Sequence, residues 1–420
     1  MGLTVAGRSL NHSHVLALGA LIAPPLAMYV PLGLSPTFII VAVLCLGLSW
    51  RERPWRSVPR DLAAGLALLL LWAAVSAWWS IEPLLAIKTT FGVAAMTAGG
   101  LVLFGYARGL DEAGRRLVRL GLATGLTLAL VMAALEIHLG GPVGYLTFDP
   151  NPQAIPLVRR LGRGLTIAII LLVPAMVSVW RCGYRRWAVA LPVLALLSIP
   201  GGENLSSKIS LVLVPLVYVT VMRWPRWGAR GLAGLAILLV LSFPLLAMAP
   251  SPQAVMDQMG KLEKFPNSAH HRYTIWTFTA RKAMEHPWRG WGMEASRNIP
   301  DGEEGVWVTR HYPLAGPPPL RGEIEIFEQF LPLHPHNGSG QVWLELGGVG
   351  AVLVCLVLGL IGRRLSREAD PVNAATAAAS FVAVLMVASV SYGIWQSWWL
   401  GALWLTAVWV SAVGTPGPNR

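Results

Sequence analysis

Charged side chains are scarce in this chain of 420 residues. Only 13% of the residues are Asp, Glu, Lys or Arg, whereas 55% are hydrophobic, and the mean hydropathy is +0.56. Soluble domains carry roughly 25% charged residues, so the composition excludes an ordinary soluble protein. It predicts an all-α polytopic membrane protein, because a chain segment that crosses a bilayer must be apolar and must satisfy its own backbone hydrogen bonds.

Cysteines and the familiar catalytic motifs are also few. The three cysteines, Cys45, Cys182 and Cys355, lie in two apolar stretches and one short loop, which argues against a disulfide framework. The sequence has no P-loop, nucleophile elbow, HExxH motif or dinucleotide fingerprint. We therefore expect no cofactor and no metal. The net charge of +12 is better interpreted loop by loop than as a sign of nucleic-acid binding.

Twelve stretches are apolar enough to be membrane helices, for which about 20 such residues are needed. They lie near residues 14–31, 35–49, 62–79, 86–106, 117–139, 164–180, 187–201, 209–223, 231–249, 339–361, 373–392 and 396–414. The expected organisation is nine helices in residues 1–249, one long segment in residues 250–338 and three helices in residues 339–420.

The basic residues predict an orientation for these helices. Nineteen of the 33 Lys and Arg residues fall on the face that also carries both termini, nearly all in short loops. The positive-inside rule makes that face cytoplasmic. Four cations break the rule in short outer loops, namely Arg159, Arg160, Arg163 and Lys208. A cation placed against this preference is expected to have a ligand, although contact with lipid phosphates would also explain it.

The segment 250–338 is too long for a structureless connection and is expected to fold over the bundle. Its middle has helical spacing from Arg272 to Ala283, and Pro287 with Gly290 is expected to end that helix. Residues 313–323 resemble an irregular flap. Three acidic residues nearby are expected to form a solvated loop face: Glu323, Glu325 and Glu328.

His334, His336 and Asn337 directly precede the tenth apolar stretch. Polar groups at the edge of a membrane are costly unless they are used. Pro335 between the histidines disfavours a metal site. One hypothesis is structural: these side chains cap the next helix or face solvent. The other is catalytic: a histidine acts as a general base, because imidazole titrates near neutrality and can accept a proton from a hydroxyl.

Four pieces of the sequence resemble the O-antigen ligase/polymerase superfamily of bacterial envelope membrane proteins. HPHNGSGQVWLELGGVG resembles its signature, in which His-Asn is followed after seven residues by Glu-x-Gly-x-x-Gly. HRYTIWTFTARKAMEHPWRGWGMEAS resembles the preceding piece, with Arg four residues before Trp and a later Gly-x-Gly. LGRGLTIAIILLVPA and ENLSSKISLVLVPLV resemble two earlier span entries, with Lys208 where Arg is usual. The pieces occur in order, and the resemblance covers residues 60–415.

Within the superfamily, the size of the long segment and the piece around Arg163 most resemble O-antigen ligase. This resemblance implies a metal- and nucleotide-independent, inverting enzyme on the periplasmic side of the bacterial inner membrane. It would transfer a polysaccharide from undecaprenyl pyrophosphate to lipid A–core.

Several cations on one face of the bundle could bind a diphosphate, because a bound diphosphate needs its charge neutralised and several hydrogen-bond donors. The hypothesis is that Arg163, Lys208 and Arg272, with Arg159 and Arg160, bind the diphosphate. His336 would act as general base, with His334 as a second candidate. Asn337 would orient His336 or cap the helix.

Two other functions share features with this interpretation. An O-antigen polymerase or an O-linked oligosaccharyltransferase would use the same donor and signature. A transporter of lipid-linked sugars would need charges in mid-span, and the apolar stretches have few, with Glu136 and Lys88 near span ends as the chief exceptions.

Overall fold

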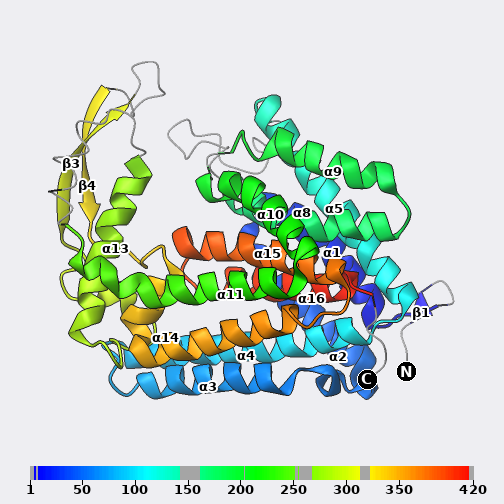
Figure 1. Cartoon of the computed structure of the whole chain (residues 1–420), viewed down its shortest axis with the longest axis horizontal. Coiled ribbons are helices and arrows are strands. Elements are labelled where there is room, and N and C mark those ends of the chain that lie inside the picture. Colours follow the sequence, from blue (N-terminus) through cyan, green and yellow to red (C-terminus); the bar gives the residue numbers. More distant parts are fainter. Residues whose placement is uncertain are drawn as a thin grey trace.

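The computed structural model describes residues 4–5, 8–141, 161–202, 204–250, 254, 267–312 and 322–415. Within these residues it is a bundle of helices with the β3–β4 hairpin at one end and the short β1–β2 pair at the other (Figure 1). The helices are α1 His12–Tyr29, α2 Leu34–Ser49, α3 Arg60–Ser76, α4 Pro83–Gly109, α5 Glu112–His138, α8 Gly162–Arg181, α9 Arg185–Ser198, α10 Leu205–Arg223, α11 Pro225–Ser242, α13 Asn267–Glu285, α14 Gly338–Leu365, α15 Pro371–Val390 and α16 Ser397–Val413. The strands are β1 Thr4–Val5, β2 Arg8–Ser9, β3 Gly305–Tyr312 and β4 Gly322–Gln329.

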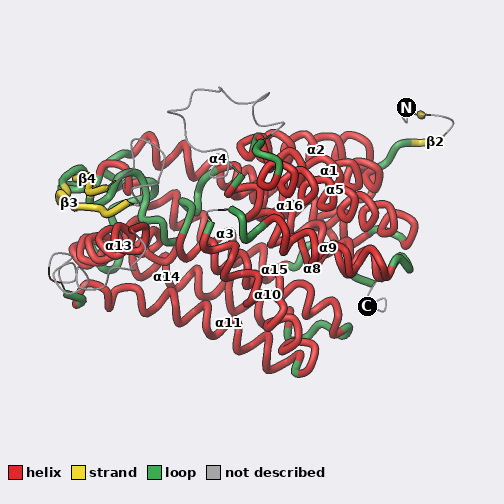
Figure 2. The backbone as a smooth tube through the Cα atoms, turned by 90° about the horizontal axis from the view of Figure 1, so that it is seen from above, coloured by secondary structure: helices red, strands yellow, loops and turns green. Residues whose placement is uncertain are grey.

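All twelve apolar stretches are helical, which confirms the all-α polytopic membrane fold. Eight helical segments in the described residues are long and apolar enough to cross a membrane. They include α2, α4, α5, α8, α10, α11, α14 and α15. The helices α1, α3, α9 and α16 are shorter or less apolar and pack in the same bundle (Figure 2).

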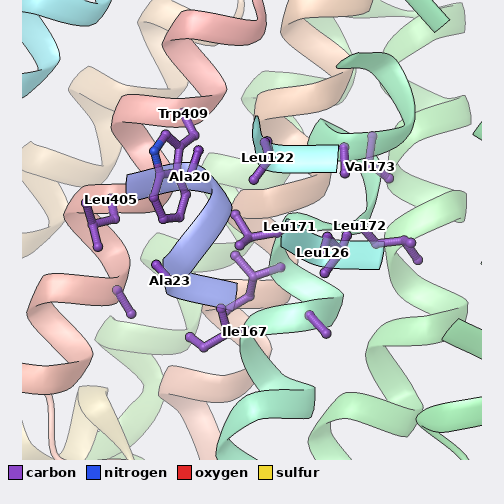
Figure 3. Close-up of a cluster of buried hydrophobic side chains, with 14 of the residues drawn as sticks. Ala20, Ala23, Leu122, Leu126, Ile167, Leu171, Leu172, Val173, Leu405 and Trp409 are labelled. Carbon is purple, nitrogen blue, oxygen red and sulfur yellow. The ribbon is translucent and has the colours of Figure 1, made fainter. Parts of the chain in front are cut away.

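The core forms where α1, α5, α8 and α16 meet (Figure 3). Ala20 of α1 faces Leu122 of α5 and Trp409 of α16 in this cluster. Small residues permit close approach here: a Cβ on Gly125 would lie 2.5 Å from the carbonyl oxygen of Leu21. Helix α8 is the most enclosed candidate span, with 83% of its apolar window buried. Its rigid setting fixes the position of its first turn, which carries Arg163.

The two ends of the bundle differ in chemistry. At one end, buried arginines bind free carbonyls at the C-terminus of α16: Arg115 donates to Gly414 at 2.9 Å and Arg119 to Val413 at 3.1 Å. Arg181 binds Asp370 there at 2.6 Å. The opposite end holds α13 and the β3–β4 hairpin, far from β1 and β2 (Figures 1 and 2). The structure thus sorts the short basic loops to one end and the long segment to the other.

The long segment contains a hairpin that the sequence analysis missed. Strands β3 and β4 pair antiparallel, with Val306 opposite Glu328. GEIEIFEQ alternates polar and apolar residues, which is a strand signal. The expectation of a solvated acidic face is wrong for Glu328, which is 1% exposed and lies 3.3 Å from His270 Nδ1 of α13. Glu325 is exposed as expected, and the 313–321 part of the flap lies outside the described residues.

Helix α14 is broken at Gly347, where φ is +63° and ψ is −165°. Residues 287–292 dock into the break. The carbonyls of Leu344 and Glu345 accept hydrogen bonds from Trp291 N and Gly292 N, each at 2.8 Å. Gly348 N then donates to the carbonyl of Pro287 at 2.7 Å. The long segment is therefore hydrogen-bonded into the bundle and does not simply rest upon it.

Gly347→Ala is expected to destabilise the protein by roughly 2 kcal/mol, because left-handed backbone is costly for alanine. The added Cβ would also lie 2.5 Å from the carbonyl group of Trp288. Thermal unfolding of the detergent-solubilised protein measures the effect. Gly359→Ala in the same helix is the control, since its Cβ would meet nothing closer than Ile237 Cδ1 at 4.0 Å. Equal unfolding temperatures for the two variants would contradict the interpretation of the break.

Candidate active site

The loop that carries His334 and His336 is held between α13 and the start of α14. Trp276 of α13 donates its Nε1–H to the carbonyl of Pro335 at 3.0 Å. Asn337 caps α14, because its Oδ1 accepts from Gly340 N at 2.9 Å. Capping is one of the two roles that the sequence analysis considered for Asn337. His336 has φ +51°, a left-handed conformation that is uncommon outside glycine, asparagine, aspartate and histidine.

This backbone places the His336 ring against the loop between α15 and α16. His336 Nδ1 lies 2.5 Å from the carbonyl oxygen of Ser391. A carbonyl can only accept, so Nδ1 carries the proton, and Nε2 of the neutral ring keeps a free lone pair. Burial lowers the pKa of His336 to about 4, with smaller contributions from the charges of His334 and Arg272. At neutral pH the ring is uncharged, with its single proton on Nδ1 and Nε2 able to accept a proton.

His334 packs beside His336 and is also held neutral. The two ring centroids are 4.2 Å apart in an edge-to-face arrangement. The backbone N–H of His336 donates to His334 Nδ1 at 3.3 Å, and burial lowers the pKa of His334. Gly393 leaves room for the ring, because a Cβ there would lie 2.8 Å from His334 Cδ2. His334 thus positions the loop of His336.

A chain of hydroxyls and amides joins this loop to α8 and α10. Ser391 Oγ lies 3.4 Å from Ser206 Oγ, which donates to Asn204 Oδ1 at 2.5 Å. Asn204 Nδ2 donates in turn to Thr166 Oγ1 at 2.7 Å. Thr166 and Ser206 are in the first turns of α8 and α10. The helix starts that carry Arg163 and Lys208 are therefore fixed at the same end of the bundle as His336.

Three of the predicted cations lie on these elements. The Arg163 guanidinium is exposed and stacks 5.3 Å from the Trp398 ring centroid. Lys208 is half-buried in the first turn of α10. Arg272 is half-buried on α13, and its charge reaches His336. None of the three has an ion-pair partner within the described part of the chain. Arg159 and Arg160 lie outside the described residues.

Glu345 is a residue of the site region to which the sequence analysis gave no role. It is fully buried in α14. Its Oε1 accepts from Ser296 Oγ at 2.5 Å and Gln341 Nε2 at 3.0 Å, and its Oε2 from Glu294 N at 2.8 Å and Trp395 Nε1 at 2.7 Å. Four donors from three parts of the chain meet on this carboxylate. In the sequence, Glu345 could have been selected because it is the Glu of the signature that this chain resembles.

The described residues contain no group of three or more His, Cys, Asp or Glu side chains that could hold a metal ion. The described residues of this region include a neutral imidazole, several helix N-termini and three cations with no carboxylate partner among those residues. Helix N-termini add partial positive charge from their free N–H groups. In such an arrangement the cations and helix N-termini can bind an anionic group, and the imidazole can accept a proton from a neighbouring hydroxyl.

Residues 190–355 match the family model described as O-Antigen ligase. This match supports membership of the O-antigen ligase superfamily. The matched stretch contains Lys208, Arg272, His336 and Glu345, whereas Arg163 precedes it.

Rickettsial proteins with the name “Putative polysaccharide ligase” are similar to this chain. The protein of Rickettsia conorii is 26% identical over 364 residues, covering 84% of this chain and 81% of the relative. That of Rickettsia felis is 25% identical, covering 80% of this chain and 76% of the relative. That of Rickettsia typhi is 30% identical over 38% of this chain and 35% of the relative. The names of these relatives and the family match support an enzyme of the ligase or glycosyltransferase kind.

Proposed function

We propose that this protein transfers a polysaccharide from undecaprenyl pyrophosphate to a hydroxyl of lipid A–core, on the periplasmic face of the bacterial inner membrane. The observation that carries the proposal is the neutral His336 ring, whose Nδ1–H is engaged by Ser391 while Nε2 stays free. The ring lies at the same end of the bundle as Arg163, Lys208 and Arg272, which have no carboxylate partner within the described ranges. The family match supports the polysaccharide class of substrate.

The proposed reaction is a single displacement. His336 Nε2 accepts the proton of the acceptor hydroxyl as its oxygen attacks the anomeric carbon of the donor. The bond from that carbon to the diphosphate oxygen breaks, and the electron pair leaves with the undecaprenyl diphosphate. Arg163, Lys208 and Arg272 stabilise the negative charge that develops on this leaving group. Attack opposite the leaving group inverts the anomeric configuration.

The direct test is transfer by the purified protein in vitro. The protein is incubated with lipid-linked polysaccharide and lipid A–core, and the product is examined for a ladder of modified lipid A–core. Chain extension of the donor without such a ladder would indicate a polymerase, and transfer to a protein acceptor would indicate an oligosaccharyltransferase. Labelling of a single cysteine introduced near residue 336 from the periplasmic side tests the proposed topology, in which both termini are cytoplasmic.

Lys208→Ala is expected to lower the transfer rate about a hundredfold, because a charged donor to a developing oxyanion contributes about 3 kcal/mol. Lys208→Arg is expected to retain activity, since it keeps the positive charge and its donors. Initial rates in membranes at equal protein amounts measure both. Lys88→Ala, an exposed lysine on α4, is the control and should match the wild type. Full activity of Lys208→Ala would exclude Lys208 from diphosphate binding.

A further inference from the structure

The end of the bundle opposite His336 has an open surface cavity of about 660 Å³ at the loop that joins α2 and α3. It is lined by Trp50, Arg51, Arg53, Trp55 and Arg56. These residues belong to two short 3-10 turns, Trp50–Glu52 and Pro54–Ser57. Nothing in the proposed transfer reaction uses this cavity.

The three arginines of the cavity have no charge partners in the part of the chain that the structure describes. The nearby Glu52 lies 3.1 Å from His12 Nδ1. Asp61, the next acidic residue along the chain, is bound to Arg364. Three guanidinium groups within six residues repel one another unless an anion lies among them.

Other arginines at this end of the bundle are engaged differently. Arg185 stacks on the Trp180 ring at 5.3 Å, Arg223 on Trp224 at 5.4 Å and Arg230 on Trp227 at 5.7 Å. No such stacking involves Arg51, Arg53 or Arg56 among the described residues. The N–H donors of these three arginines therefore remain available to a ligand. The rings of Trp50 and Trp55 pack against each other, with centroids 5.2 Å apart.

The loop that carries these arginines is anchored to α4. Tyr106 of α4 donates its hydroxyl to the carbonyl of Ser49 at 2.9 Å. Pro54 is buried against α4, where a Cβ on Gly105 would lie 2.2 Å from the Pro54 carbonyl oxygen. Arg53 has φ +49°, an uncommon conformation that a residue keeps when its surroundings impose it. The backbone positions of the three arginines are therefore fixed before any ligand arrives.

We propose that this cavity binds the headgroup of an anionic phospholipid of the surrounding membrane. Arginine forks bind phosphate oxygens in pairs, and tryptophans favour the interface between headgroups and acyl chains. The outward face of α2 leads to the cavity with exposed apolar side chains, since Ile40 is 57% and Val43 61% exposed. The acyl chains lie along this face while the phosphate sits among Arg51, Arg53 and Arg56.

The experiment uses the full-length protein in four forms, purified under identical conditions. They are the wild type, the triple variant R51Q/R53Q/R56Q, the triple variant R51K/R53K/R56K, and the control R223Q/R226Q/R230Q. The control removes three exposed arginines from another loop of the same end. Each is placed in phosphatidylcholine nanodiscs with increasing phosphatidylglycerol. Co-purified lipid is counted by native mass spectrometry, and unfolding temperatures are measured.

The wild type and the control are expected to retain phosphatidylglycerol and to unfold at higher temperature as its fraction increases. R51Q/R53Q/R56Q should lose both effects, and R51K/R53K/R56K should bind at least about fivefold more weakly, because lysine lacks the planar fork. Equal retention of phosphatidylglycerol by all four forms would overturn the proposed site. A loss of phosphatidylglycerol in the control as large as that in R51Q/R53Q/R56Q would overturn it as well. Stabilisation by inorganic phosphate alone as large as that by phosphatidylglycerol would overturn the assignment to a lipid. Monodisperse elution and unchanged helicity verify folding.

Discussion

Replacement of His336 by alanine is expected to lower polysaccharide transfer at least about a hundredfold, since a positioned general base contributes 10²- to 10⁴-fold. The variant loses the ring whose Nε2 lone pair would accept the hydroxyl proton, and it loses the bond to Ser391. The rate is measured in membranes and in vitro, with protein amounts matched by immunoblot. His336→Gln keeps an amide that can still donate to Ser391 and isolates the loss of the base.

His334→Ala is the companion variant, and it is expected to have a smaller effect. His334 accepts from the backbone of His336 and packs on its ring, so its loss loosens His336 without removing the base. A larger loss in His334→Ala than in His336→Ala would transfer the base role to His334. Full activity of His336→Ala would exclude the proposed mechanism.

The lowered pKa of His336 also predicts how stability varies with pH. An unfolded chain has a histidine pKa near 6.5, whereas burial holds the pKa of folded His336 at about 4. Between these values the unfolded chain binds a proton that the folded chain does not, so the free energy of unfolding decreases as pH falls from 6.5 to 4. His336→Gln should flatten this decrease in a series of thermal unfolding measurements. An unchanged slope would show that His336 is not buried in its neutral form.

Replacement of Glu345 by leucine is expected to destabilise the protein by roughly 4 kcal/mol. The change leaves four donors without their acceptor in a buried site, and each unsatisfied group costs about 1–3 kcal/mol, with some relief by relaxation. Those donors come from Gln341, from the turn around Glu294 and Ser296, and from Trp395. Thermal unfolding in detergent measures the loss.

A second readout separates a positioning role of Glu345 from a purely structural one. Trp395 belongs to the loop whose Ser391 carbonyl holds His336. Glu345→Gln keeps part of the hydrogen bonding, so the folded variant should lose transfer rate more than substrate affinity. Glu112→Gln is the control, because Glu112 pairs with Arg119 at the other end of the bundle. Glu345→Gln with the wild-type rate and stability would contradict this role.

Much of the fold could be predicted from local sequence. Apolar stretches marked the positions of twelve helices, because the hydropathy of a stretch is a property of its own residues. Pro287 and Gly290 correctly predicted the end of α13, which stops at Glu285. Asn337 was recognisable as a cap from its position before α14. The basic short loops gathered at one end, as alternation of the helices requires.

The site was predictable in its residue types but not in its contacts. His336 and the cations could be selected because polar groups beside a bilayer are costly. The tautomer of His336 depends on a backbone carbonyl of Ser391, in a stretch that carries no motif. The burial of Glu345 and Glu328 and the break at Gly347 were likewise missed.

The sequence by itself determined that this protein is a helical membrane protein, where its helices lie, and which of its residues could carry charge or accept a proton. Only the tertiary structure decided which of those groups meet. Apolarity and helix length are properties of contiguous residues, so they can be deduced locally. Hydrogen bonds such as those of His336 to Ser391, or Trp395 to Glu345, join residues at least 50 positions apart, and only the packing of whole helices brings them within reach.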